Sequence, residues 1–496
     1  MIRPISRSLI RLISHPPLSA GLALCLVLCT AGCTVSLAPA YRVTKEAHEV
    51  RFVPAQIPEV RVRSSYTLEN YGNGDLSSID VILPNAKIYG LKALLIKVNG
   101  REVSPVELSA EPATEEATMF RIPFDPAWNQ KQRRDLVIEY TFASPEDLGT
   151  NVALSSTSFH VISRGWLPRL QPPTHVLSPS PASPKRVAYT VQVPADFLLL
   201  APGKPAGRTK NGGGVKHRFE LRESDPAPFI VAGRYVDSCS NRRPCAAAFW
   251  TLTPIERDLA PAEEQIASAW DLLQKNFGPL QKNNLVPHVA ESPGMRRIDY
   301  DVPAAAPFPG GVLVNSQAIS LGVYSGDFLD LVTRALAGNW FGVQIYSQDS
   351  AVGMTEGLSD YAVIVIAEAR HGDTARSDRV LGFLQEYDDA CKEAVEKPLV
   401  TVTMRDPVEQ RRIALAKAPL FFIALEDTYG EASVRQGLAE VVRLLRGQEV
   451  GYQDIRAAIE NVTNKDLAPI FRTWLYKPGI PAEFRERYQS AGAREN

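Results

Sequence analysis

The segment from Gly326 to Gly372 constrains the fold of this 496-residue chain more than any other stretch, because its pattern predicts two helices joined by a loop. In its first half, apolar residues recur at steps of three and four, which is typical of a helix with one buried face. The second helix is expected to begin near Thr355, whose hydroxyl can cap a first turn, and to end at Gly372. The apolar positions of the first helix are Phe328, Leu331, Val332, Ala335, Leu336 and Trp340.

Two phrases in this segment resemble a known metal-binding core. Trp340-Phe341-Gly342, followed by Thr355-Glu356-Gly357, is similar to the zinc-binding region of the aminopeptidase-N-like metallopeptidases, a branch of the gluzincins. In that family the first helix carries H-E-x-x-H before W-F-G, and the second helix supplies a Glu as the third zinc ligand. The two His and the Glu hold the ion, and the intervening Glu activates the zinc-bound water.

This sequence departs from that motif at most of its positions. Alignment on Trp340 places Arg334 at the first His, Ala335 at the general-base Glu and Gly338 at the second His. Arginine keeps its proton and cannot bind zinc, and glycine has no side chain to offer. Glu356 alone remains at its ligand position. The resemblance therefore implies the family fold without a zinc ion and without peptidase chemistry.

Two further positions of the family motif are also altered. The stretch from Phe308 to Asn315 resembles the family's G-A-M-E-N strand, whose Glu binds the free amine of the substrate, and alignment places Val314 there. The family also has an oxyanion-stabilising Tyr two residues before a Lys. If Lys417 is that Lys, the position of the Tyr is held by Leu415.

Arg334 and Glu356 form the most informative pair among these positions. Both would approach one zinc ion in the family, so we hypothesise that the guanidinium takes the place of the cation and binds the carboxylate at two points. The alternative is that Arg334 points to solvent. Another metal site is hard to build, since none of the seven histidines pairs with another at i and i+4. Glu368 and His371 form either a displaced ligand set or a solvated helix end, where the dipole favours His371.

The remaining sequence predicts a multidomain protein of mixed α and β structure. Short alternating runs, such as those around Val60 and Asp135, predict an N-terminal antiparallel β-sandwich with the family's saddle shape. Helical periodicity then predicts a thermolysin-like α+β domain with a helical C-terminal part. The expected divisions are a leader at 1–33, a tether at 34–49, the β domain at 50–238, the thermolysin-like domain with its degenerate site at 239–400, and the helical part at 401–496.

The N-terminus has the features of an export signal. Arg3, Arg7 and Arg11 precede a short apolar run, and the sequence ending at Cys33 resembles a bacterial lipobox. Cys33 would then carry a lipid that anchors the protein to the membrane on the periplasmic side of the cell envelope, in the outer membrane by the usual sorting rule. An uncleaved anchor and an ordinary secretory leader are the alternatives.

Cysteine usage and charge agree with an exported protein. Cys239 and Cys245 enclose a short loop and are expected to form a disulfide, the alternative being a metal-binding pair. Cys391 would be free. The formal net charge of −1 does not favour nucleic acid as a partner, and no nucleophile elbow or phosphate-binding loop is present.

The sequence thus predicts an exported lipoprotein with a catalytically inactive aminopeptidase fold, that is, a pseudo-enzyme without a cofactor. Its expected ligand is a peptide, an envelope polymer or a partner protein, bound in the cleft between the β domain and the helical domain. One alternative is a zinc metallo-aminopeptidase that uses non-standard ligands. Another is a structural or assembly lipoprotein.

Overall fold

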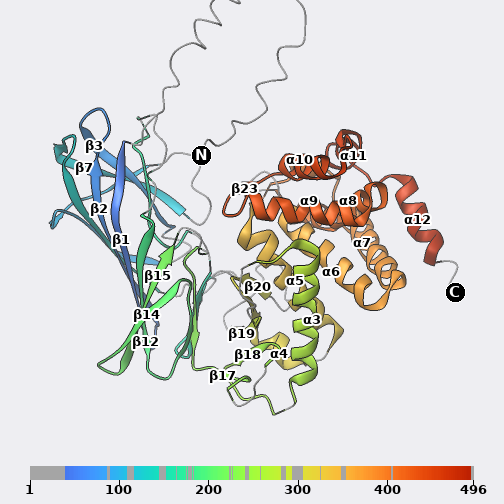
Figure 1. The fold of residues 1–496 in the computed structure, drawn as a ribbon, viewed down its shortest axis with the longest axis horizontal. Coiled ribbons are helices and arrows are strands. Elements are labelled where there is room, and N and C mark those ends of the chain that lie inside the picture. The colour runs from blue at the N-terminus through green and yellow to red at the C-terminus, as the bar shows by residue number, and fades with distance from the viewer. Residues whose placement is uncertain are drawn as a thin grey trace, which may run out of the picture.

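The computed structural model describes residues 40–492, apart from the segments 86–89, 109–116, 144–151, 163–164, 175, 177–180, 182–183, 223–224, 226, 241–244, 257, 281–285, 293–304, 324, 348–352 and 404–405. The predicted leader and Cys33 lie outside these described residues. The chain forms a β-rich N-terminal lobe beside a mixed lobe whose C-terminal part is helical (Figure 1). Among the described residues, no helix has the length and apolar character needed to span a membrane.

An eight-stranded sheet is the main layer of the N-terminal lobe. Its strands alternate between buried and exposed side chains, as Val60, Arg61 and Val62 illustrate. Neighbouring strands run antiparallel, as predicted, except that β1 and β12 are parallel. The order across the sheet is β14 (Lys204–Asn211), β15 (Gly214–Arg222), β12 (Arg186–Pro194), β1 (Tyr41–Val53), β2 (Glu59–Asn70), β8 (Arg133–Ala143), β4 (Leu91–Val98) and β5 (Arg101–Glu102).

The predicted tether at 34–49 is wrong over its second half, because β1 begins at Tyr41. The alternation that would reveal this strand is interrupted by a bulge between Val43 and Lys45. Beyond the bulge, His48 and Val50 point inward beside Ser64 and Val62 of β2.

Two smaller sheets share a hydrophobic core with the inner face of the large sheet. The core contains aromatic side chains from several strands, and Phe52 stacks on Phe159 with ring centroids 4.5 Å apart. One sheet has the order β13 (Leu198–Leu200), β16 (Ile230–Gly233), β10 (Ser158–Val161) and β9 (Val152–Leu154). The other has the order β11 (Arg169–Gln171), β3 (Leu76–Pro84), β7 (Ala117–Trp128) and β6 (Val106–Leu108).

The second lobe starts with a five-stranded mixed sheet. Its three inner strands are mutually parallel, and an antiparallel strand lies at each edge. The order is β17 (Val236–Asp237), β18 (Ala248–Thr251), β19 (His288–Ser292), β21 (Gly311–Asn315) and β20 (Ala305–Phe308).

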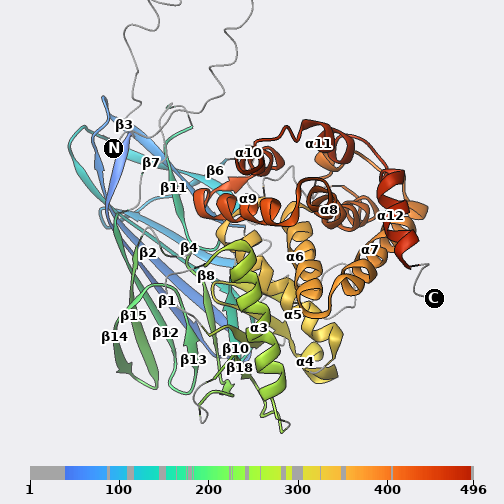
Figure 2. The same cartoon turned by 45° about the vertical axis from the view of Figure 1, so that its right-hand side comes forward.

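Helices cover one face of this sheet and continue into the C-terminal part (Figure 2). They are α3 (Ala260–Phe277), α4 (Ser316–Gly322), α5 (Gly326–Gly338), α6 (Met354–His371), α7 (Asp373–Glu393), α8 (Val408–Tyr429), α9 (Glu431–Leu444), α10 (Tyr452–Thr463), α11 (Ala468–Leu475) and α12 (Ala482–Gly492). Shorter elements are the π-helical η2 (Asn339–Gln344), the 3-10 turn η3 (Leu399–Thr401), and the strand pair β22 (Tyr346–Ser347) and β23 (Glu449–Val450).

The other face of the five-stranded sheet packs against the N-terminal lobe. Phe229 contacts Phe308 with ring centroids 5.7 Å apart, within an apolar cluster that draws residues from both lobes. Polar contacts reinforce it, since Ser292 Oγ lies 3.1 Å from Nδ1 of His160. Tyr235 Oη donates to the Glu291 carbonyl oxygen at 2.9 Å. The two lobes therefore share a buried interface.

The predicted helix pair is present as α5 and α6, with two differences at its ends. The helical turns after α5 widen into η2, where Phe341 leaves helical geometry at φ −106° and ψ 29°. Helix α6 is preceded by Gly353 at φ 84°, so Thr355 is not its cap. At the other end, Gly372 has a φ of 82° and ends the helix where the sequence predicted.

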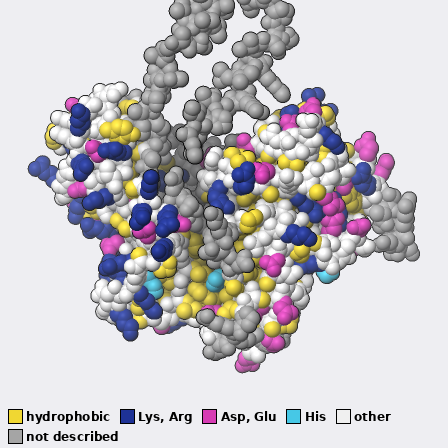
Figure 3. Space-filling model, viewed as in Figure 1, with side chains coloured by type: hydrophobic (Ala, Val, Ile, Leu, Met, Phe, Trp, Pro, Cys, Tyr) yellow, Lys and Arg dark blue, Asp and Glu magenta, His cyan; other side chains and the backbone are white. Residues whose placement is uncertain are grey.

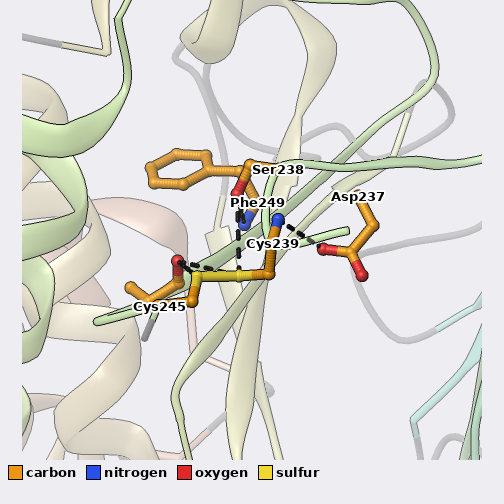
Figure 4. Close-up of a disulfide and its surroundings, with 6 residues drawn as sticks. Asp237, Ser238, Cys239, Cys245 and Phe249 are labelled. Carbon is orange, nitrogen blue, oxygen red and sulfur yellow. Dashed lines mark hydrogen bonds between the residues drawn. A yellow bond between two sulfur atoms is a disulfide. The ribbon is translucent and has the colours of Figure 1, made fainter. Parts of the chain in front are cut away.

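A disulfide joins Cys239 to Cys245 near the start of the second lobe (Figure 4). The two Cα atoms are 5.7 Å apart. The backbone N–H of Cys239 donates to Asp237 Oδ1 at 2.9 Å, and Ser238 Oγ accepts from the N–H of Phe249 at 3.0 Å. These contacts hold the bridge against β18. Cys391 is half-buried and has a free thiol.

Candidate functional site

The contact between α5 and α6 places Arg334, which the sequence alignment assigned to the first ligand position, beside an acidic residue of α6. Arg334 on α5 reaches across to Asp360 on α6 and binds its carboxylate at two points. Arg334 Nη2 donates to Asp360 Oδ2 at 3.1 Å, and Nε donates to Oδ1. The negative charge of Asp360 raises the pKa of Arg334, so the guanidinium stays charged. The two side chains are 30% and 12% exposed, so the ion pair is largely enclosed.

The predicted partner of Arg334 is therefore wrong. Glu356 lies four positions before Asp360 on the same helix and is exposed to solvent. Its Oε2 accepts from the hydroxyl of Thr355 at 2.9 Å. The negative charge of Glu356 also raises the pKa of Arg334, but its effect is smaller than that of Asp360. Because Glu356 is exposed to solvent, its carboxylate needs no partner cation to offset burial. The guanidinium of Arg334 instead reaches Asp360, one turn further along α6.

Gly338, which the sequence alignment assigned to the second His ligand, has no room for a side chain. A Cβ placed on Gly338 would lie 2.7 Å from Cγ and 3.0 Å from Cβ of Pro307. Pro307 lies on the edge strand β20, directly against α5. Any ligating residue at position 338 would require the strand to move away from the helix.

Two other altered positions belong to the hydrophobic core. Ala335 is 6% exposed, and Val314 is fully buried in the same cluster. Val314 lies in β21, which is paired on both sides by β19 and β20. The side chain of Val314 therefore faces the helical core and offers no polar group to a substrate amine.

Lys417 is buried in α8, and its ammonium group is hydrogen-bonded within the protein. Its Nζ donates to Glu396 Oε1 at 2.7 Å and to the carbonyl oxygen of Lys477 at 2.9 Å. Burial lowers the pKa of Lys417, and Glu396 opposes that shift. Leu415, two residues earlier on the same helix, is half-buried and has no group that could stabilise an oxyanion.

Further charged groups surround the Arg334–Asp360 pair. Desolvation by its surroundings and the negative charge of Asp360 raise the pKa of Glu386 on α7. On the other side of Glu356, the hydroxyl of Tyr452 is buried without a hydrogen-bond partner among the described residues. Burial, followed by the charge of Glu356, raises the pKa of Tyr452. The described part of the site thus combines the Arg334 guanidinium with several carboxylates, and Arg412 also acts on Glu386.

A second group of acids lies elsewhere in the helical part. Carboxylate oxygens of Glu368, Glu426 and Glu431 lie within 4.8 Å of one another, a spacing that could hold a cation. Two arginines already bind them. Arg376 Nη1 is 2.7 Å from Glu426 Oε2, and Arg435 Nη2 is 2.9 Å from Glu368 Oε2. The guanidinium groups supply the positive charge that a metal ion would otherwise provide.

The proposed ligand pair Glu368 and His371 is not formed. The carboxylate of Glu368 turns to the two arginines, whereas His371 is exposed at the end of α6. The structure therefore favours the solvated helix end over a displaced ligand set.

The donor set around Arg334 does not fit a zinc ion. A catalytic zinc site needs three protein ligands and an open position for water. Here the first ligand position holds a guanidinium that is bound to Asp360, and the second is closed by Pro307. Glu356 alone cannot hold the ion.

Sequence reasoning missed Asp360, Glu386 and Pro307. Asp360 could have been found, because residues four apart share a helix face and Asp360 follows Glu356 at that spacing. Pro307 could not, since its contact with Gly338 joins residues from a strand and a distant helix.

Comparison with known proteins supports the fold. No family model and no curated protein sequence matches this chain. The structure is similar to an M1 zinc metallopeptidase from Deinococcus radiodurans, with a TM-score of 0.60, 16% identity, and 90% of this chain and 97% of that chain covered. It is also similar to aminopeptidase A from Legionella pneumophila, with a TM-score of 0.61, 15% identity, and 89% of this chain and 50% of that one covered. The chain thus has the fold of the M1 zinc aminopeptidases.

Proposed function

We propose that this protein is an exported, lipid-anchored member of the M1 fold that binds a ligand without zinc and without hydrolysing peptides. The lipid would be attached at Cys33 and would hold the protein at the periplasmic face of the outer membrane. The ligand would be a peptide, an envelope polymer or a partner protein, bound in a cleft between the β domain and the helical domain.

The ion pair between Arg334 and Asp360 carries this proposal. Arg334 puts a permanent positive charge at the position that the alignment assigns to a zinc ligand. Its Nη2–Oδ2 contact of 3.1 Å with Asp360 is a charge-assisted hydrogen bond. Removing one partner would leave the other partly desolvated and unpaired. A zinc ion would therefore have to displace the guanidinium from Asp360, and it would meet carboxylates rather than the two His of the family motif.

The packing at Gly338 supports the same proposal independently. The 2.7 Å approach of Pro307 Cγ to an added Cβ excludes a side chain there. A peptidase that used other ligands would need them from elsewhere, and the acidic group around Glu426 is already bound by Arg376 and Arg435.

The test is the metal content and activity of the purified protein, expressed with zinc supplied and then dialysed. We expect less than about a tenth of an equivalent of zinc, since a genuine protein site retains its metal. We also expect no cleavage of aminoacyl reporter substrates. Close to one equivalent of zinc, together with hydrolysis that a chelator abolishes, would overturn the proposal in favour of a metallo-aminopeptidase with unusual ligands.

A further inference from the structure

The outer face of the eight-stranded sheet carries a groove that the site between α5 and α6 does not involve. The groove has a volume of about 740 Å³ and lies across β14, β15, β12, β1, β2 and β8. This volume is typical of a pocket that binds a small molecule or a segment of a polymer.

Small side chains form the floor of the groove. Strand pairing places Ser65, Ala47 and Ala188 side by side on three adjacent strands, pointing outward. Outward-facing positions recur at every second residue along each strand, so the next outward residues form one row on each side of this floor. These neighbouring rows carry larger side chains and form the walls of the groove. One wall carries Thr190 and Arg218, which are paired across β12 and β15. The other wall carries Asp135, Thr67, Lys45 and Arg186.

The carboxylates that line the groove are already engaged. Asp135 Oδ1 accepts from the hydroxyl of Thr67 at 2.9 Å, and Glu220 Oε2 lies 3.5 Å from Nη1 of Arg186. Glu46 points to the inner face, where its Oε1 lies 3.0 Å from Nε2 of His48.

Two cations on opposite walls are available to a ligand. Lys45 and Arg218 are both exposed, and neither forms an ion pair with any residue in the described part of the chain. Figure 3 shows Lys and Arg side chains over much of the visible surface of the N-terminal lobe. The groove therefore combines two unpaired positive charges with a floor and walls that offer hydroxyl groups.

We propose that this groove binds an acidic polysaccharide, that is, a sugar chain bearing carboxylates. Lys45 and Arg218 would bind two carboxylates of the chain, while Ser65 and Thr190 would hydrogen-bond its hydroxyl groups. The narrow floor of Ser65, Ala47 and Ala188 leaves space for a chain of rings laid across the strands.

A peptide is a poorer fit to the same surface. Peptides commonly add to an exposed sheet edge, where unpaired backbone groups supply hydrogen bonds. This groove lies on the face of the sheet, where the backbone groups of β1, β2 and β12 already pair with one another. Recognition must come from side chains, and hydroxyls with isolated cations match the alternating polar groups of a carboxylated sugar chain.

The test is calorimetric titration of the full-length protein, purified in mild detergent, with oligogalacturonate as the acidic sugar probe. We expect saturable binding, and we expect Lys45→Gln and Arg218→Gln each to weaken it about tenfold. Ala188→Trp, which fills the floor from an exposed position, should abolish binding while leaving the thermal unfolding midpoint unchanged. Arg51→Gln is the matched control, because Arg51 is an exposed outward cation of β1 outside the groove.

Two comparison probes separate the alternatives. An uncharged oligosaccharide of the same length should bind at least about tenfold more weakly, since it cannot use Lys45 and Arg218. Equal binding of poly-glutamate would overturn the sugar assignment in favour of an acidic peptide. Absence of binding, or binding that Ala188→Trp leaves intact, would overturn the proposal that this groove is the binding site. None of these outcomes bears on zinc content or peptidase activity, so the two proposals fail separately.

Discussion

Lys417 and Glu396 form a buried ion pair in which Nζ lies 2.7 Å from Oε1 and the side chains are 1% and 8% exposed. The pair connects α8 to the segment that follows α7. Glu396 also accepts from the hydroxyl of Tyr387 and from the backbone N–H of Gly479, while Lys417 donates to the carbonyl oxygen of Lys477. Lys417, the residue that the resemblance used to locate the catalytic Tyr position, therefore helps to hold the C-terminal helices together.

The first prediction concerns this pair. Lys417→Met leaves the Glu396 carboxylate buried without its cation, so we expect the free energy of unfolding to fall by about 3–5 kcal/mol. Chemical denaturation measures the change. Lys392→Met is the control, because Lys392 forms an exposed pair with Asp389 at 2.6 Å, and solvent screening leaves such a pair little effect on stability. Equal effects of the two substitutions would show that Lys417 is not buried as described.

The second prediction separates the two carboxylates near Arg334. Asp360→Asn removes a charged, largely enclosed acceptor, and we expect it to lower the free energy of unfolding by about 1.5–3 kcal/mol. Glu356→Gln alters an exposed side chain and should change stability by no more than about 0.5 kcal/mol. A larger effect of the Glu356 substitution would mean that Glu356 is the true partner of Arg334.

The third prediction concerns the contact between Gly338 and Pro307. Gly338→Ala forces a Cβ against the proline ring, so we expect a loss of about 1–3 kcal/mol in unfolding free energy. Adding Pro307→Gly should recover part of that loss, since the two sites are in direct contact. Gly342→Ala is the matched control, because a Cβ there meets no atom within 4 Å. Additive effects of the two substitutions would contradict the contact.

The fourth prediction is a pH dependence centred on Asp406. Hydrogen bonds from Lys397 and then from the Thr403 backbone lower the pKa of Asp406 to about 2. Because this pKa is depressed in the folded state, the stabilisation is fully present above the unfolded pKa of about 3.9 and is lost as the pH falls toward 2.

The measurement is the difference in unfolding free energy between the wild type and Asp406→Asn. We expect a difference of up to about 1 kcal/mol after solvent screening. It should be constant from neutral pH down to about pH 5 and should vanish near pH 2. A difference that persists unchanged at the acidic end would show that the altered hydrogen bonding of the amide, rather than the lost charge, is responsible.

The sequence by itself determined the local elements and their order. Apolar spacing predicted α5 and α6, and alternation predicted the strands of the N-terminal lobe, because both patterns follow from the geometry of a few consecutive residues. The family resemblance, read from the sequence, assigned Arg334 to the first ligand position and Gly338 to the second, and these assignments stay predictions. Where local regularity failed, as at the bulge after Val43, the prediction of β1 failed with it.

Only the tertiary structure decided which side chains meet. Arg334 pairs with Asp360 rather than with Glu356 because the packing of α5 on α6 sets how far along α6 the guanidinium reaches. The closure of Gly338 by Pro307, and the groove whose floor combines Ser65, Ala47 and Ala188, likewise join residues from separate elements. Contacts of this kind depend on how whole elements pack, which no short stretch of sequence encodes.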